Sequence, residues 1–284
     1  MTASAFWTTS RFALDLSQPK VMGIVNITPD SFSDGGNAAA SSALAHAEQL
    51  LSDGADLLDL GAESTRPGAA PVPGEVELQR LLPVLREAVK LGVPISVDTY
   101  KPAVMRAALD AGADIINDVW GFRQPGALDV VAVHPSCGLV VMHMHGEPQT
   151  MQVLPMQGEA SAQVLLFLEQ SIEEILRQMG KNTPNLQIQN RICLDCGIGF
   201  GKTVAQNFEL LQNQAALLTL GYPLLAGWSR KSSLGAVTGL AVHDRMIPSV
   251  AAALLAVERG ARVLRVHDVR ETVQALKVWQ AATA

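Results

Sequence analysis

The chain has 284 residues, of which 48% are hydrophobic and 17% charged, and its formal net charge is −6. This composition excludes global disorder, and the acidic balance argues against nucleic-acid binding, which needs an extended basic surface. No apolar run reaches the roughly 18 residues that span a bilayer, and the first residues do not have the character of a secretory signal. Three cysteines are too few for a disulfide framework, so a cytoplasmic location is expected.

Eight short apolar runs recur along the chain, and each is followed by polar residues. They cover residues 21–25, 57–60, 95–97, 115–116, 139–142, 192–194, 224–226 and 263–264. Helical-looking stretches separate most of them, and alternation of strands with helices predicts a parallel sheet. Eight strands in this length predict an α/β protein with one (β/α)8 TIM barrel over residues 21–284. Residues 1–20 are predicted to form an extension whose short strand, around residues 12–16, covers the lower mouth of the barrel.

The helices are predicted from apolar spacing and from their end signals. They cover residues 38–52, 75–90, 103–111, 160–179, 204–220, 244–259 and 269–280, with a weaker signal within 125–133. Asn37 is a candidate cap, Pro102 suits a first helical turn, and Gly112 and Gly180 are expected to end two of the helices. Residues 27–36, 146–159 and 181–190 are predicted to be loops.

Polar residues at the predicted strand ends form the first candidate site. Asp98, Asn117 and Asp195 follow three different strands, and barrel enzymes place their site where the strands end. Two carboxylates and an amide suit a flat heterocycle with an amino-amide edge, such as a pterin or a purine. The alternative is that each residue only caps the helix that follows it.

Cationic residues follow three other strand ends and form a second candidate group: Arg66, Arg230, Lys231, Arg265 and His267. Converging cations suit a phosphate or diphosphate, because Arg offers a bidentate fork and Lys a movable point charge. The side chains of Arg265 and His267 would share one face of a strand. The alternative is ordinary solvated surface charge.

Three other motifs are weaker. The glycine-rich residues 197–203 resemble a phosphate-binding P-loop, but Cys196 stands where that pattern needs glycine, so Lys202 and Thr203 are expected to start a helix. Cys193 and Cys196 have no second pair with which to hold zinc. His143 and His145 offer a metal-binding alternative of low weight.

Taken together, the motifs closely resemble those of bacterial dihydropteroate synthases. The matching stretches are residues 22–36 (MGIVNITPDSFSDGG), 59–68 (ending ESTRPG), 96–102, 116–118, 142–144, 195–202, 229–232 and 265–268, in the order of the family. The first two are highly specific. Ala62, His145 and Cys196 depart from the family pattern, but they remove none of the polar groups named above.

The resemblance implies a transferase of folate biosynthesis that joins 6-hydroxymethyl-7,8-dihydropterin diphosphate to 4-aminobenzoate. It further implies that sulfonamides compete for the aminobenzoate site, that Mg²⁺ is bound, and that the protein is a homodimer. The implied residues are Asp98, Asn117, Asp195 and Lys231 for the pterin, Thr65, Arg265 and His267 for diphosphate, Phe32, Pro67 and Ser232 for aminobenzoate, and Asn26 for magnesium. Lys231, Arg66 and Asp98 would lie nearest the chemistry.

The sequence leaves two alternative functions. A pterin-binding methyltransferase domain would use a related barrel to pass a methyl group to a corrinoid, but residues 63–66, 229–232 and 265–267 suit diphosphate and aminobenzoate instead. A non-enzymatic paralogue would keep the barrel as a binding module. All the polar residues named above for the synthase are present, which argues against a non-enzymatic paralogue.

Overall fold

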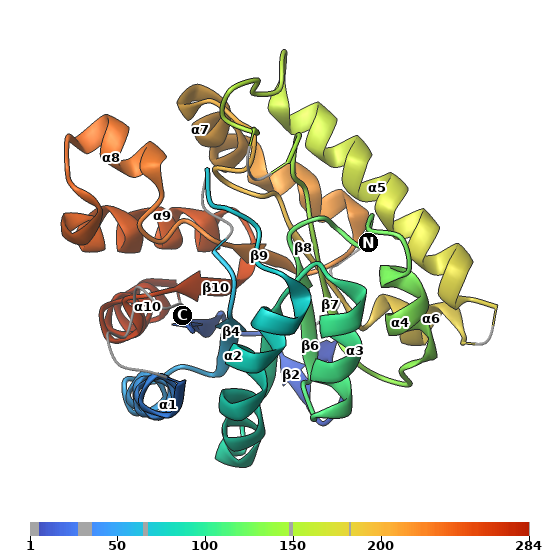
Figure 1. The fold of residues 1–284 in the computed structure, drawn as a ribbon. Helices are drawn as coiled ribbons and strands as arrows, with labels where there is room; N and C mark the ends of the chain where they lie inside the picture. Colours follow the sequence, from blue (N-terminus) through green and yellow to red (C-terminus); the bar gives the residue numbers. More distant parts are fainter. Residues whose placement is uncertain (1–5, 28–35, 65–67, 148–149, 182, 284) are drawn as a thin grey trace.

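The structure is a computed structural model that describes residues 6–27, 36–64, 68–147, 150–181 and 183–283. Its centre is a closed barrel of eight parallel strands (Figure 1), which confirms the predicted TIM barrel. The strands are β3 (Lys20–Asn26), β4 (Leu57–Gly61), β5 (Ile95–Asp98), β6 (Ile115–Asp118), β7 (Gly138–Met142), β8 (Ile192–Asp195), β9 (Leu224–Ala226) and β10 (Ala261–Val266). Each predicted run lies within one of these strands.

The helices surround the barrel, as expected for βαβ units. They are α1 (Gly36–Ser52), α2 (Gly74–Ala88), α3 (Pro102–Asp110), α4 (Ala127–Val133), α5 (Ala160–Met179), α6 (Asn185–Gln189), α7 (Val204–Asn213), α8 (Ser232–Thr238), α9 (Met246–Glu258) and α10 (Val269–Thr283), with 3-10 turns η2 (Val89–Leu91), η3 (Gln214–Leu220) and η4 (Val242–Asp244). Two of the helices, α6 and α8, were not predicted. Helix α6 lies in the segment predicted as a loop, and both helices are too short to show a periodic apolar pattern.

Local signals explain several helix boundaries. Pro102 is the first residue of α3, where its missing N–H costs no hydrogen bond, and Gly180 caps the C-terminus of α5. Thr203 caps α7 through a capping box, because its side chain accepts from the N–H of Gln206 while the Gln206 side chain accepts from the N–H of Thr203. Helix α1 begins at Gly36, so Asn37 lies inside the helix and does not cap it.

The register of the barrel brings the predicted polar residues to one end. Asp98 on β5 pairs with Gly61 on one side and with Asn117 on the other. Asp195 pairs with Met142 across β7 and β8. Because the strands are parallel, their carboxyl ends share one rim, and the side chains of distant segments meet there.

The opposite end of the barrel is covered by an antiparallel hairpin formed by β1 (Phe6–Thr8) and β2 (Ala13–Asp15). Trp7 is fully buried in a cluster with residues that point into the barrel from several strands, and its indole N–H donates to the carbonyl of Arg191 at 2.8 Å. The expected short strand thus corresponds to β2, while β1 was not predicted. A closed lower end leaves the upper rim as the place for ligands.

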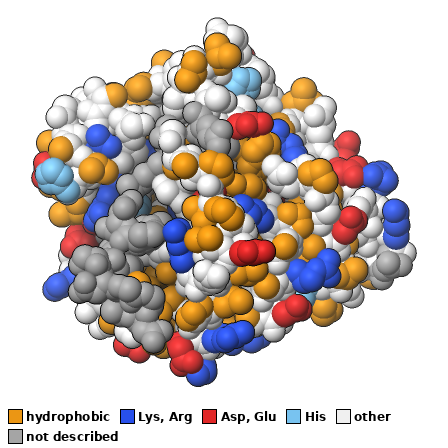
Figure 2. Space-filling view, viewed as in Figure 1, with side chains coloured by type: hydrophobic (Ala, Val, Ile, Leu, Met, Phe, Trp, Pro, Cys, Tyr) orange, Lys and Arg blue, Asp and Glu red, His pale blue; other side chains and the backbone are white. Residues whose placement is uncertain are grey.

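The surface shown in Figure 2 carries basic and acidic side chains interspersed among hydrophobic ones. Within the segments that the structure describes, no helix has the length and apolar character needed to cross a membrane.

Candidate active site

Two carboxylates and an amide face a recess at the carboxyl end of the barrel. The recess is lined by Asp98, Asn117, Val119, Met142, Asp195, Ile198, Phe200, Gly227, Lys231 and Arg265. The structure therefore brings together the three residues proposed for a heterocycle and two of the cations proposed for phosphate. Sequence patterns did not single out the apolar part of this lining, because those side chains form a wall only once the barrel has closed.

Arg265 joins two carboxylates at the centre of this group. Its Nε lies 2.6 Å from Oδ2 of Asp59, and its Nη2 lies 2.7 Å from Oδ2 of Asp98. Burial opposes the charge of the guanidinium, but the two carboxylates outweigh it and raise the pKa of Arg265. Arg265 is therefore a permanent cation in the recess.

Asp98 has an oxygen that no protein group satisfies. Its Oδ1 is buried and has no hydrogen-bond partner among the described residues. Burial raises the pKa of Asp98 to about 7, although the charge of Arg265 acts in the opposite direction. A buried acceptor without a partner is costly, so a ligand that donates a hydrogen bond to Oδ1 gains binding energy there.

Asp195 is buried at the end of β8, and its Oδ1 accepts from the N–H of Gly197 at 2.7 Å. Burial raises the pKa of this carboxyl group, while the Gly197 hydrogen bond and the charge of Lys231 lower it. The added Cβ of a non-glycine residue at position 227 would lie 3.9 Å from Oδ2 of Asp195. A Cβ at this position would therefore make only an ordinary van der Waals contact with the carboxylate.

Lys231 immediately precedes α8, and its side chain lines the recess. Its Nζ lies 4.3 Å from the centre of the Phe200 ring, within the range of a cation–π contact. Burial lowers the pKa of Lys231 to about 8, and the nearby Asp195 acts in the opposite direction. The amine therefore titrates close to neutral pH.

The glycine-rich residues 197–202 wrap around a second lysine, which sequence analysis treated only as part of a helix start. Lys202 is buried, and its Nζ donates to the carbonyls of Gly197 at 2.8 Å and Phe200 at 3.1 Å. A longer contact of 3.4 Å reaches the carbonyl of His143. Burial lowers the pKa of Lys202 to about 7. These contacts hold the turn that places Phe200 against Lys231.

The remaining predicted residues lie around the recess without lining it. Nδ1 of His267 lies 2.9 Å from Oγ of Ser229, just beyond β10. Ser232 is exposed at the start of α8, and Asn26 is partly buried at the end of β3. Arg230 pairs with Asp268 at 2.6 Å, so its charge is engaged with a neighbouring loop.

Four predicted residues, Phe32, Thr65, Arg66 and Pro67, lie outside the described residues. The flanks of the segment 65–67 are described. Glu63 accepts from the N–H of Val72 at 3.0 Å and from the hydroxyl of Tyr100 at 3.1 Å, and it forms an ion pair with Lys101. Lys101 also pairs with Glu77 at 2.6 Å. This network ties residues on both sides of the segment to the start of α3.

The positions that depart from the family pattern are compatible with this arrangement. Ala62 is buried next to the site, and burial raises the pKa of the Cys196 thiol to about 12, which keeps it protonated. His145 is exposed, whereas His143 is buried and its pKa is lowered to about 2, so His143 stays neutral. Among the described residues, no three His, Cys, Asp or Glu side chains gather as metal ligands.

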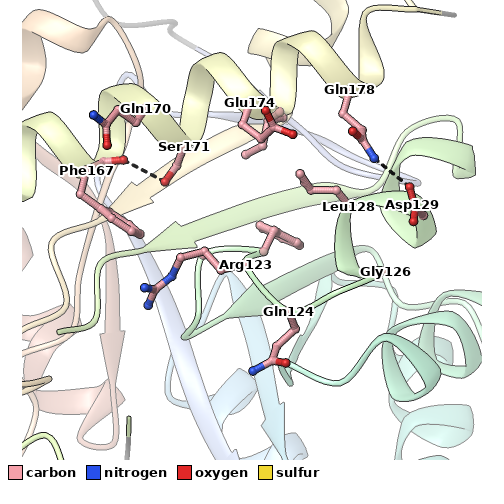
Figure 3. Close-up of a pocket in the computed structure, with 13 residues that line it drawn as sticks. Arg123, Gln124, Gly126, Leu128, Asp129, Phe167, Gln170, Ser171, Glu174 and Gln178 are labelled. Carbon is pink, nitrogen blue, oxygen red and sulfur yellow. Dashed lines mark hydrogen bonds between the residues drawn. The ribbon is translucent and has the colours of Figure 1, made fainter. Parts of the chain in front are cut away.

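A larger cavity of about 420 Å³ lies outside the barrel mouth, between α5 and the loop before α4 (Figure 3). Most of its polar side chains already bind other protein groups. Gln178 donates to Asp129 at 2.8 Å, and Arg123 donates to two backbone carbonyls. Convergence of charged groups, and not volume, therefore identifies the smaller recess as the candidate active site.

The barrel and its recess define an enzyme-like site that can hold a flat, hydrogen-bonding ring beside an anionic group. Residues 22–267 match the family model for pterin binding enzymes, and the chain belongs to this family.

Named relatives are consistent with this assignment. The chain is 47% identical to the dihydropteroate synthase of Neisseria meningitidis serogroup B over 282 residues, which cover 97% of this chain and 96% of the relative. It is similar to the Xanthomonas albilineans dihydropteroate synthase with 4-aminobenzoic acid, with a TM-score of 0.90, 48% identity and 99% coverage of both chains. The Yersinia pestis dihydropteroate synthase with a sulfonamide drug gives a TM-score of 0.90, 41% identity and coverage of 98% and 99%.

Proposed function

We propose that the chain is a dihydropteroate synthase. It condenses 6-hydroxymethyl-7,8-dihydropterin diphosphate with 4-aminobenzoate to give 7,8-dihydropteroate and diphosphate. The observation that carries the proposal is the convergence of Asp98, Asn117 and Asp195 with the cations Arg265 and Lys231 around one recess. A ring with an amino-amide edge needs the two carboxylates and the amide, and a leaving diphosphate needs the two cations.

The pterin occupies the recess in this proposal. Its ring N–H groups donate to the carboxylates of Asp98 and Asp195, and the unpartnered Oδ1 of Asp98 provides one acceptor. Asn117 supplies both a donor and an acceptor. The ammonium of Lys231 lies beside the ring, next to Asp195. Together these contacts fix the ring so that its exocyclic methylene faces the rim.

The reaction follows a dissociative route. The bond between the methylene carbon and the diphosphate oxygen breaks first, and its electron pair leaves with the diphosphate. The pterin stabilises the methylene cation, the amine of 4-aminobenzoate attacks it, and the nitrogen then loses one proton. The protein stabilises the departing charge and excludes water, and this step requires no covalent nucleophile.

The diphosphate binds to Arg265 and His267, with Thr65 as a third contact. A magnesium ion bound to the diphosphate would offset its charge, and Asn26 would hold that ion through its amide oxygen. One neutral oxygen at the end of β3 fits this role, because Mg²⁺ keeps several waters and is often held mainly by substrate phosphates.

The 4-aminobenzoate binds between Phe32, Pro67 and Ser232, with Arg66 beside it. Ser232 follows Lys231 directly, so this pocket adjoins the pterin recess. Sulfonamides bind in the same pocket and compete with 4-aminobenzoate. In this arrangement Lys231, Arg66 and Asp98 lie nearest the carbon that reacts.

The protein is a homodimer in this proposal, with the face formed by α8, η4 and α9 as its interface. This face exposes Val237, Val242 and Ile247, whose exposed fractions are 59%, 48% and 73%, and α8 and α9 lie together at the left edge of Figure 1. Large apolar side chains left exposed on neighbouring helices suit an association surface. An Ile247→Glu variant is expected to shift the mass in solution from dimer to monomer, whereas a monomeric parent protein contradicts the dimer.

We place the protein in the cytoplasm, since Cys137, Cys193 and Cys196 are all free thiols.

Turnover of the purified protein tests the function. Incubation with the pterin diphosphate, 4-aminobenzoate and magnesium is expected to release 7,8-dihydropteroate and diphosphate in equal amounts. Absence of both products refutes the proposal. Binding of a pterin without turnover supports a non-enzymatic paralogue, and demethylation of methyltetrahydrofolate with a corrinoid acceptor supports a methyltransferase domain.

A further inference from the structure

Asp59 lies beneath the recess, in the middle of β4, and its side chain is fully buried inside the barrel. Three donors from three other strands converge on its carboxylate. Ser96 Oγ on β5 donates to Oδ1 at 2.6 Å, and Arg265 Nε on β10 donates to Oδ2 at 2.6 Å. Asn117 Nδ2 on β6 lies 3.3 Å from Oδ2 and 3.4 Å from Oδ1.

Both oxygens of Asp59 are therefore engaged by protein groups. Asp98 differs, because its Oδ1 has no partner among the described residues. Asp59 pairs with Ser96 across β4 and β5, whereas Asp98 pairs with Gly61, two residues nearer the rim. Asp59 is also absent from the lining of the recess. Asp98 is placed to meet a ligand, and Asp59 is placed to hold the residues that do.

We propose that Asp59 is a positioning residue whose carboxylate fixes the guanidinium of Arg265 and the amide of Asn117 for the ligand. The Nε of Arg265 is bound to Asp59, which leaves the Nη groups directed toward Asp98 and the recess. When a pterin engages Asp98, the contact with Asp59 keeps the guanidinium in place. The inference rests on the proposed function, in which Arg265 binds the diphosphate and Asn117 binds the ring.

The chemistry of the three neighbours explains why a carboxylate is needed at this position. Ser96, Asn117 and the Nε of Arg265 all donate, and an ionised carboxylate is a group that only accepts. An asparagine at position 59 would turn an NH₂ group toward at least one of these donors. That contact leaves buried donors unsatisfied and removes the charge that orients Arg265.

The Asp59→Asn variant tests the proposal. The KM for the pterin diphosphate is expected to rise about tenfold, which corresponds to about 1.4 kcal/mol, whereas the KM for 4-aminobenzoate stays within about twofold. In an Arg265→Lys variant, the additional Asp59→Asn change is expected to raise the KM for the pterin diphosphate by less than it does in the unmodified protein. The reason is that Arg265, the residue that Asp59 positions, is already altered. Equal changes in both KM values, or additive effects, would overturn the proposal.

The Asp114→Asn variant is the matched control. Asp114 is also fully buried and pairs with an arginine, Arg11, at 2.6 Å, but it binds the N-terminal hairpin at the opposite end of the barrel. This variant is expected to lower the unfolding midpoint and leave both KM values unchanged. If Asp114→Asn raises the KM for the pterin diphosphate as much as Asp59→Asn does, Asp59 acts only through stability.

A second variant covers the case in which Asp59→Asn does not fold. Ser96→Ala removes one donor and keeps the carboxylate, so the loosened Asp59 is expected to raise the KM for the pterin diphosphate about threefold. An unchanged KM there contradicts the proposal. Absence of turnover in the unmodified protein refutes the proposed function itself, whereas normal turnover with an unaffected Asp59→Asn variant refutes only this inference.

Discussion

The ammonium of Lys231 lies 4.3 Å from the centre of the Phe200 ring, and both side chains line the recess. The ring belongs to the turn that Lys202 holds through the carbonyls of Gly197 and Phe200. Lys231 thus depends on two separate segments, the residues before α8 and the glycine-rich turn after β8. This contact restricts where the Lys231 cation can lie relative to a bound ring.

Replacement of this cation is expected to reduce turnover. Lys231→Ala removes a charged contact near the reacting carbon, and a loss of one such group lowers kcat by about 100-fold. Lys277→Ala, which removes an exposed lysine on α10, provides the control and is expected to retain full turnover. Steady-state kinetics measure both variants, and an unchanged kcat in Lys231→Ala would place this residue outside the active site.

The pKa of Lys231 predicts an alkaline limit to activity. Burial lowers this pKa to about 8, so the ammonium is present below that pH and is lost as the pH rises through it. We expect kcat/KM to fall about tenfold per pH unit above the limit. In Lys231→Arg the cation persists, because arginine stays protonated, and the limit is expected to move to higher pH. The same alkaline limb in both proteins would assign it to another group.

Asp195 is expected to determine pterin affinity. Asp195→Ala leaves the donors of the ring without an acceptor, at a cost of about 1–3 kcal/mol, and so weakens pterin binding by about 5- to 150-fold. Asp195→Asn retains an oxygen for the N–H of Gly197 but turns its NH₂ group toward the ring donors, so it is expected to lose affinity as well while keeping the turn after β8. Calorimetric titration with a pterin compares the two, and near-normal affinity of the alanine variant rules out the assigned contact.

A pair of glycine substitutions isolates the steric role of the turn after β8. Gly197 has a φ of +67°, and an added Cβ would lie 1.9 Å from the carbonyl oxygen of His143. Gly92 has a φ of +75°, but an added Cβ there would meet nothing within 4 Å. Gly92→Ala should cost about 1 kcal/mol of unfolding free energy, and Gly197→Ala about 2 kcal/mol more. Urea denaturation measures both values, and equal losses contradict the steric explanation.

The barrel was predictable because its signals are local. Each strand contains a short, mainly apolar run with polar residues at its end or soon after it, and helix ends such as Pro102 and Gly180 carry their own conformational preferences. The elements that were not predicted are those in which such local signals are weak. Helix α6 is five residues long and β1 is three, so neither repeats its apolar spacing often enough to be recognised.

The candidate site was predictable only as a set of residue types. Asp98, Asn117 and Asp195 were identified because each follows a strand, and the register places them together. The side chains that pair with the site residues could not be predicted. The ion pair between Asp59 and Arg265 joins positions 206 residues apart, and no local pattern indicates which two charges will meet. The role of Lys202 likewise depends on how the turn folds around it.

Barrel closure also has a consequence for synthesis of the protein. Strand β10 carries Arg265 and is the last strand of the barrel, where it pairs with β3, the first. A nascent chain therefore lacks the guanidinium, and its barrel stays open, until translation has passed residue 266 and that strand has left the ribosome. Substrate can therefore use the complete recess, and stabilise the closed barrel, only after β10 has been made.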